Sequence, residues 1–167
     1  MDETTKLNIL KAHYFGEKSA TDYLVVYKNI CEILNEHLKE KPDKDYLKYY
    51  DETGIAVSYS YAEFIKKVFQ LANYLLKNNI IKGDRVATFS HNHSDTVILY
   101  FACWTIGAVV VPVNVSEEDQ RVKYIFDNSD TKIIFTRDNY FDKLNNLVSP
   151  EKILVVNFNE FSFESLS

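Results

Sequence analysis

The stretch "IGAVVVPVN", residues 106–114, decides the fold class of this chain, because it places small and β-branched apolar residues in an unbroken run between Gly107 and Pro112. Unbroken apolar runs are typical of strands that are covered on both faces, as in a parallel sheet flanked by helices. A membrane helix is the alternative, because residues 96–116 carry no charge and about 20 residues suffice to cross a bilayer. Gly107 and Pro112 interrupt that stretch, and its acidic flanks lack a basic anchor. We therefore predict a buried helix that turns into a buried strand, and no transmembrane segment.

Composition favours a globular cytoplasmic protein. The 167 residues, 46% of them apolar, suit one domain or a large segment of one, with a sizeable core. The net charge of −5, with basic and acidic residues interspersed, argues against nucleic acid as a partner. The N-terminus "MDETTKLNIL" lacks the basic start and apolar core of a secretion signal, so we expect a cytoplasmic location. Cys31 and Cys103 lie far apart in apolar segments, which favours reduced thiols that pack in the core.

A helix and a hairpin are expected in the first third of the chain. Apolar residues at helical spacing from Tyr27 to Leu38 predict a helix that ends at Pro42. The aromatic and β-branched runs Tyr46–Tyr50 and Ile55–Tyr59 flank "DETG", in which Gly54 can take the positive φ of a short loop. We expect the two runs to pair as an antiparallel β-hairpin.

From residue 60 onward, helical and strand patterns alternate. Ser60 and Glu63 have the spacing of a capping box, and Gly107 suits a helix C-terminus. We expect three helices, with Ser60, Ser94 and Ser116 as their N-caps. The expected strands lie in "KGDRVATFS" (82–90), "AVVVPVN" (108–114) and "TKIIFT" (131–136). The tail adds one more helix and the strand "KILVV" (152–156). The rhythm predicts an α/β fold, a parallel-sheet layer with flanking helices plus the antiparallel β-hairpin.

Two segments resemble a known family. "YSYAEF", followed by "IKGDRVATFSHNHSDTVILYFACWTIGAVVVPVNVSEEDQRVKYIFDNSDTKIIFT", is similar to the N-terminal part of the acyl-adenylate-forming superfamily, the AMP-forming acyl-CoA synthetases and their relatives. The resemblance is strongest over residues 45–136. Tyr61-Ala62-Glu63 matches the first core motif of the family, and Gly107 to Pro112 matches the second. The resemblance implies the acetyl-CoA-synthetase-like large N-terminal domain.

The family resemblance also implies an activity. Its members are two-step ligases in which a carboxylate, a small-molecule substrate, attacks the α-phosphate of ATP, bound with Mg²⁺, to give acyl-AMP. Coenzyme A, the co-substrate, then displaces AMP. The four glycines of this chain are too far apart for a glycine-rich phosphate loop. We therefore expect residues 1–167 to be a single N-terminal segment of a longer synthetase, inactive alone, without the phosphate loop and the C-terminal lid domain. A non-catalytic, stand-alone α/β interaction module is the alternative.

Structural roles are sufficient to account for the motif residues. Glu63, Gly107 and Pro112 serve as a helix cap, a helix terminus and strand punctuation, and none has the spacing of a nucleophile, a base or a metal ligand. We assign no catalytic residue and no metal ligand to this chain.

The loop "SHNHSD" and the turn "VNVS" hold the candidate binding residues. His91, Asn92 and His93 follow a strand, at the edge where open α/β sheets bind ligands, so we expect them to face substrate. Two histidines without a further Cys or His cluster do not predict a metal site.

Asn114, Val115 and Ser116 follow the next strand. Asn114 offers a donor and an acceptor, and a helix that begins at Ser116 would favour an anion. The resemblance implies that this turn borders the path of coenzyme A. Asn114 has a structural alternative, in which its side chain only satisfies the backbone of the turn.

Overall fold

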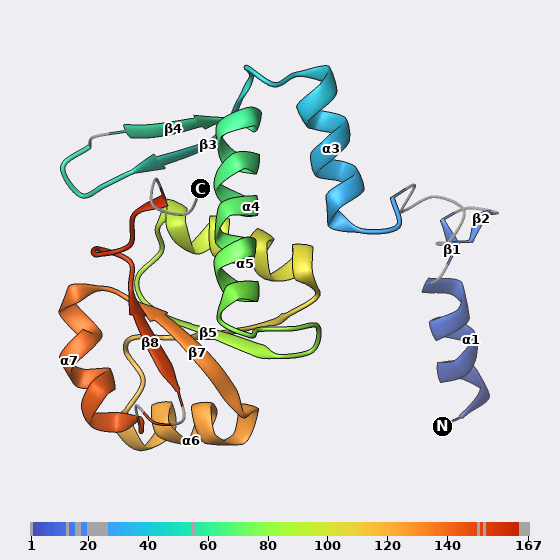
Figure 1. Cartoon of the computed structure of the whole chain (residues 1–167). Coiled ribbons are helices and arrows are strands. Elements are labelled where there is room, and N and C mark those ends of the chain that lie inside the picture. Colours follow the sequence, from blue (N-terminus) through green and yellow to red (C-terminus); the bar gives the residue numbers. More distant parts are fainter. Residues whose placement is uncertain are drawn as a thin grey trace.

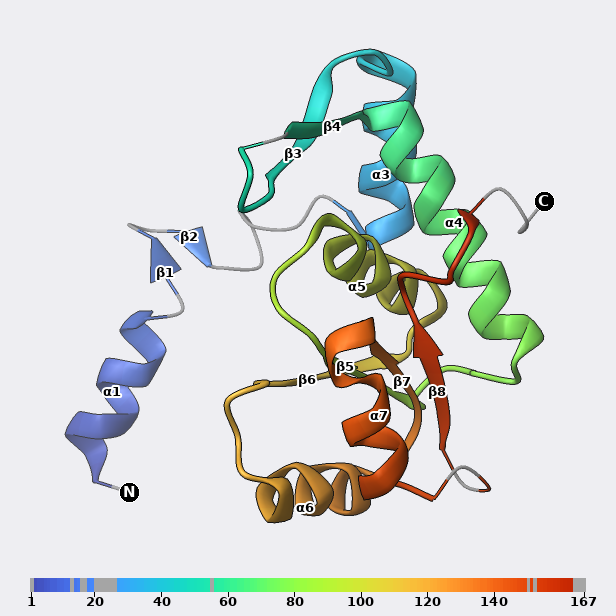
Figure 2. The same ribbon diagram turned by 90° about the vertical axis from the view of Figure 1, so that its left-hand side faces the viewer.

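The computed structural model describes residues 2–12, 14–15, 18–19, 27–54, 56–149, 151 and 153–163 (Figure 1). At the N-terminus, α1 (Glu3–Ala12) is followed by the two-residue strands β1 (Tyr14–Phe15) and β2 (Lys18–Ser19), which pair antiparallel. Figures 1 and 2 show this arm apart from the remaining elements, which form the body of the molecule.

A four-stranded parallel sheet forms the centre of the body. Its strands are β5 (Arg85–Phe89), β6 (Val109–Val113), β7 (Thr131–Thr136) and β8 (Leu154–Asn157), in the spatial order β6-β5-β7-β8. Val86 lies opposite Val110, and Ala87 lies opposite Ile134, in parallel register. The predicted parallel layer and the α/β fold class are confirmed.

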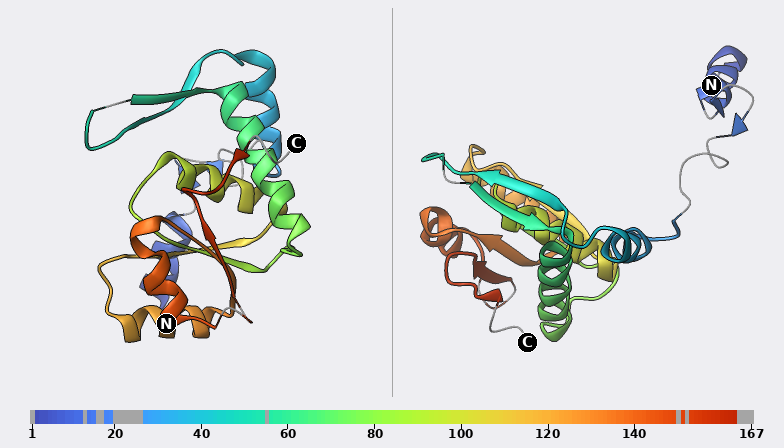
Figure 3. Two further views of the ribbon diagram at one scale, coloured as in Figure 1. Left: turned by 60° about the vertical axis from the view of Figure 1, so that its left-hand side comes forward. Right: turned by 90° about the horizontal axis from the view of Figure 1, so that it is seen from above.

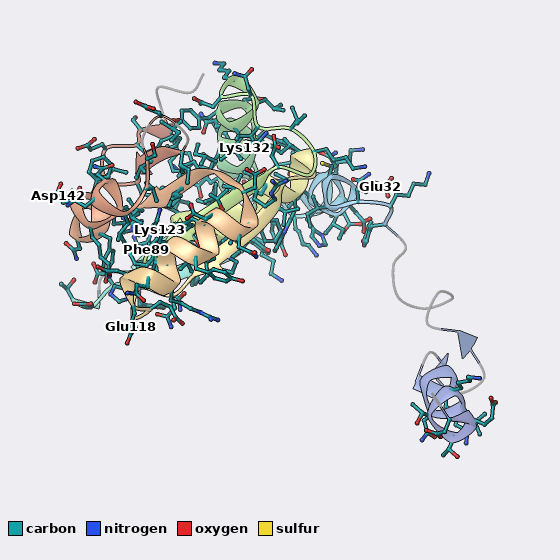
Figure 4. All side chains as sticks on the ribbon, turned by 90° about the horizontal axis from the view of Figure 1, so that it is seen from below. Glu32, Phe89, Glu118, Lys123, Lys132 and Asp142 are labelled. Atoms are coloured by element: carbon teal, nitrogen blue, oxygen red, sulfur yellow. The ribbon has the colours of Figure 1, made fainter. Side chains whose placement is uncertain are left out.

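The helices cover both faces of the sheet because the order in which successive strands are added reverses at β5. β6 and β7 lie on opposite sides of β5, so right-handed crossovers place the connecting helices on opposite faces. Figure 3 shows α3 (Ile30–Glu40), α4 (Tyr61–Lys77) and α5 (Ser94–Ile106) on one side, and α6 (Asp119–Ser129) and α7 (Asp138–Leu147) on the other. In Figure 4 Glu118 and Asp142 point outward on the side of α6 and α7.

Two hydrophobic cores result, and alternate residues of each strand belong to different cores. Val86 and Phe135 pack with α3, α4 and α5, whereas Phe89 and Ile134 pack with α6 and α7. Cys103 is buried in the first core, where burial raises the pKa of its thiol to about 12. Cys31 is half-buried, and both cysteines are free, as predicted.

The hairpin and the helix after it follow the sequence prediction. β3 (Asp45–Tyr50) and β4 (Ala56–Ser60) pair antiparallel, and Gly54 takes a φ of 79° in the connecting loop. The predicted second run began at Ile55, which lies outside the described residues. At the start of α4, Ser60 Oγ accepts from the Glu63 backbone N–H at 3.2 Å and Glu63 Oε2 accepts from the Ser60 N–H at 2.8 Å. The capping box is confirmed.

Three predicted N-termini of helices are wrong. α3 begins at Ile30, because Asn29 accepts the N–H of Glu32 as N-cap, and Tyr27 lies before the helix. The N-cap of α5 is His93, whose ring replaces the predicted Ser94 hydroxyl. α6 begins at Asp119 with Glu118 as N-cap, so Ser116 is not a helix cap.

The prediction that the strand within residues 108–114 is covered on both faces is confirmed only in part: Val110 packs with the first core and Val111 and Val113 with the second, but the start of the strand is exposed. β6 lies at an edge of the sheet, and Val109 is 48% exposed. Pro112 has no backbone N–H to donate to a neighbouring strand, and proline is tolerated in edge strands for this reason. Within the uncharged stretch, the helix α5 is 13 residues long and ends before Gly107, its C-cap, which adopts the left-handed backbone conformation. None of the helices in the described ranges has the length and hydropathy of a membrane span.

Candidate functional site

A cavity of about 390 Å³ lies at the carboxyl edge of the sheet, between the ends of β5 and β6. Parallel α/β sheets bind ligands at this edge. β5 and the loop after it, the first two turns of α5, and β6 with the turn after it supply the lining. The lining residues are Thr88, Ser90, His91, Asn92, Thr96, Tyr100, Pro112, Val113, Asn114 and Val115.

The lining is polar but carries no Asp, Glu, Lys or Arg. Two pairs of hydroxyl groups lie within it: Thr88 Oγ1 is 3.3 Å from Tyr100 Oη, and Ser90 Oγ is 3.5 Å from Thr96 Oγ1. Hydroxyl groups and the side-chain amides of Asn92 and Asn114 can donate and accept hydrogen bonds. The cavity therefore suits a neutral, hydrogen-bonding group better than a phosphate, which needs a cation or a cradle of N–H groups.

The structure brings most of the predicted site residues together. His91 and Asn92, from the loop after β5, line the same cavity as Asn114 and Val115, from the turn after β6. This proximity follows from the parallel pairing of β5 with β6, which aligns their carboxyl ends.

Ser116 and His93 are outside that lining. The Ser116 N–H donates to Asn114 Oδ1 at 2.9 Å. This N–H group is therefore already hydrogen-bonded within the turn and does not point to a ligand. Asn114 thus performs the structural task considered for it, and it lines the cavity as well. An anion site at a helix that starts at Ser116 is wrong, because residues 114–117 form a turn and α6 begins later.

His93 caps α5 instead of facing the cavity. Its Nδ1 accepts the Asp95 backbone N–H at 3.2 Å, and its ring packs 4.4 Å from the Tyr49 ring of the hairpin. Burial, followed by the charge of Arg137, lowers the pKa of His93 against the opposing effect of the Asp95 carboxylate. Asp95 Oδ2 lies 3.1 Å from the same nitrogen, but the lowered pKa favours a neutral ring, so this contact is not an ion pair near neutral pH.

Two functional candidates, Arg137 and Tyr140, escaped sequence reasoning, because they reach the β5 loop from the end of β7 and the start of α7. Arg137 Nη2 donates to Asp95 Oδ2 at 2.6 Å, and the two side chains are 19% and 16% exposed. The Tyr140 hydroxyl lies 2.5 Å from His91 Nε2. No local pattern marks these contacts, which depend on β7 lying beside β5. In the described parts of the chain, no three His, Cys, Asp or Glu side chains gather as a metal site would require.

The strand order defines an α/β domain of the doubly wound kind, with a cavity at the carboxyl edge of its sheet. Comparison with known proteins narrows the class. The chain belongs to the AMP-binding enzyme family, whose model matches residues 34–167. The family expected from the sequence motifs is confirmed.

Two curated relatives are ligases by name. A medium/long-chain-fatty-acid–CoA/3-oxocholest-4-en-26-oate–CoA ligase of Mycobacterium marinum is 28% identical over 125 residues, which are 75% of this chain and 22% of that protein. A long-chain-fatty-acid–CoA ligase of Bacillus subtilis is 26% identical over 137 residues, which are 80% of this chain and 24% of that protein. The chain thus spans less than a quarter of the length of either relative.

A solved structure shares the fold. The fatty acid AMP ligase from Legionella pneumophila superposes on 84% of this chain and 25% of its own with a TM-score of 0.71. The two sequences are 15% identical, so this likeness concerns the fold alone.

Proposed function

We propose that this chain is the N-terminal segment of an AMP-forming acyl-CoA ligase. In this reaction a carboxylate oxygen attacks the α-phosphate of ATP and pyrophosphate leaves. The thiol of coenzyme A then attacks the acyl carbon and AMP leaves. The family match over residues 34–167 and the similarity to fatty-acid–CoA ligases support this reaction class.

The residues of this chain do not fit the phosphates of ATP. Gly16, Gly54, Gly83 and Gly107 are its only glycines, and they are too far apart in sequence to form a glycine-rich loop. A phosphate cradle needs consecutive N–H groups from a glycine-rich loop, with a lysine for the developing charge. We therefore assign the ATP and Mg²⁺ steps to other segments of the enzyme and derive no step through them here.

The cavity does fit the pantetheine arm of coenzyme A. That arm is uncharged and carries two amide groups, which match the hydroxyl and amide lining between β5 and β6. The side chains of Asn92 and Asn114 would pair with those amides and orient the arm. The observation that carries this proposal is the meeting of the two predicted segments, residues 91–92 and 114–115, at one cavity.

A mutation at Asn114 tests the proposal in the ligase that contains this segment. Asn114→Asp keeps an oxygen that accepts the Ser116 N–H and adds a negative charge at the cavity. We expect the KM for coenzyme A to rise severalfold while ATP–pyrophosphate exchange, which needs no thiol, stays unchanged.

The matched control is Asn145→Asp on the exposed surface of α7. It should alter neither half-reaction. Equal losses in both half-reactions, or no change in the Asn114 variant, would return Asn114 to its structural role in the turn.

A stand-alone interaction module is the second candidate, and one surface favours it. Tyr100, Trp104, Val109, Val110 and Pro112 line a mainly apolar groove beside the edge strand β6, with Trp104 47% exposed. The coding sequence after Ser167 separates the two candidates. A glycine- and serine-rich phosphate motif there supports the ligase, and a stop codon directly after Ser167 supports the module.

A further inference from the structure

The corner between β7 and α7 holds the loop that follows β5. At the start of this loop, the Thr136 hydroxyl donates to the Phe89 carbonyl oxygen at 2.8 Å in a buried position. In its middle, the Tyr140 hydroxyl lies 2.5 Å from His91 Nε2. The Tyr140 ring also packs edge-on against Phe89, with 5.4 Å between the ring centroids. Two points of the loop are thus tied to the residues that end β7 and begin α7.

A third tie lies just beyond the loop, in the first turn of α5. Arg137, the N-cap of α7, donates from Nη2 to Asp95 Oδ2 at 2.6 Å. The backbone N–H of Asp95 is bound to His93 Nδ1, so the ion pair also holds the residue at the end of the loop. Both charged side chains are largely buried, and a partly buried, charge-assisted pair constrains geometry more than an exposed one does.

The other side of the same loop faces the cavity, where the contact between the Ser90 and Thr96 side chains is weaker. Ser90 Oγ and Thr96 Oγ1 are 3.5 Å apart, which is long for a hydrogen bond between hydroxyl groups. Asn92 lines the cavity and is exposed. The stronger contacts at the β7–α7 corner therefore determine the position of the loop that forms this wall of the cavity.

We propose that Tyr140 and Arg137 are positioning residues for this cavity. Neither side chain lines it. They place His91 and Asn92 against its occupant and thereby set its affinity for the pantetheine arm of coenzyme A. The inference rests on the proposed function for the identity of the occupant, whereas the hold on the loop is independent of it.

Tyr140→Phe is the sharpest test, because it removes one hydroxyl group and keeps the ring on Phe89. Pantetheine is titrated into the 167-residue chain while the amide resonances of Asn92 and Asn114 are followed by NMR. We expect the variant to bind pantetheine about fivefold more weakly, the factor that corresponds to the net loss of about one hydrogen bond. Hydrogen exchange of the amides of residues 91–92 should accelerate, with the thermal midpoint nearly unchanged.

Two further variants control the experiment. Tyr124→Phe makes the same change at an exposed tyrosine of α6 and should leave pantetheine affinity and exchange unaltered. In a His91→Ala background, Tyr140→Phe should have no further effect, because its partner is already absent.

The outcomes separate the two proposals. If the wild-type chain does not bind pantetheine but exchange at residues 91–92 accelerates in Tyr140→Phe, the occupant is wrong and the hold on the loop stands. Unchanged exchange in that variant overturns the positioning role. An equal loss of pantetheine affinity in Tyr124→Phe, or additive losses with His91→Ala, overturns it as well.

Discussion

Two separate features favour glycine over other residues at position 107, the C-cap of α5. Gly107 terminates α5 with a φ of 75°, a conformation that costs a residue with a Cβ about 1–2 kcal/mol. A Cβ at this position would also lie 3.0 Å from Lys82 Cγ, closer than ordinary contact. We expect Gly107→Ala to lower the free energy of unfolding by about 1–2 kcal/mol or slightly more, measured by urea denaturation.

Gly83 provides the matched comparison. Its φ is 88°, and a Cβ there would meet no atom within 4 Å. Gly83→Ala therefore carries the conformational cost without the contact with Lys82, and its loss should be the smaller of the two. A larger loss for Gly83→Ala would show that the approach to Lys82 is not a constraint.

At the scale of an element, the N-terminus of α5 depends on a neutral histidine. Because burial lowers the pKa of His93 in the folded protein, the unfolded chain binds a proton there more readily. The stability that the neutral ring contributes is present above its ordinary pKa, about 6.5, and decreases as the pH falls below that value. Asp95, Arg137 and Tyr49 are the groups that face the ring.

We expect this dependence to weaken in His93→Asn, since Asn caps helices well and does not titrate. Thermal midpoints of the wild type and the variant are compared between pH 7.5 and about 5, the range that brackets the ordinary histidine pKa. The midpoint of the wild type should fall more steeply on acidification. Parallel curves for the two proteins would show that His93 is not the source of the dependence.

β6 shows what an element pattern leaves open. Its run of valines predicted a strand correctly, but the same run suits a central strand and an edge strand alike. Only the order of the sheet shows that β6 is an edge strand, and Val109 is 48% exposed there. An apolar run reports that a segment prefers an extended, partly buried conformation, and not which neighbours cover it.

At the scale of the whole molecule, the cavity and the glycine content lead to one prediction about nucleotides. The cavity lining has no Lys or Arg, and the four glycines of the chain are too far apart for a glycine-rich loop. We expect the 167-residue chain neither to bind MgATP measurably by calorimetry nor to release pyrophosphate with any carboxylate. Micromolar binding of MgATP would contradict the assignment of the phosphate steps to other segments.

The candidate site was predictable in part. The loop "SHNHSD" and the turn "VNVS" could be found, because each follows a strand whose carboxyl end points to the ligand edge of a parallel sheet. Their individual roles were not predictable. His93 caps α5, and the Ser116 N–H donates to Asn114. Short-range hydrogen bonds of this kind compete with a ligand for such polar groups.

By itself, the sequence determined the α/β class, the succession of elements from α3 to β8, the capping box at Ser60 and Glu63, and the helix end at Gly107. These features depend on periodicity and on backbone conformations that are local to a few residues. Only the tertiary structure decided that β6 lies at an edge, that residues 91–92 meet residues 114–115, and that Arg137 reaches Asp95. Strand order arises from burial summed over both faces of a sheet, a property of contacts between distant segments that no single segment encodes.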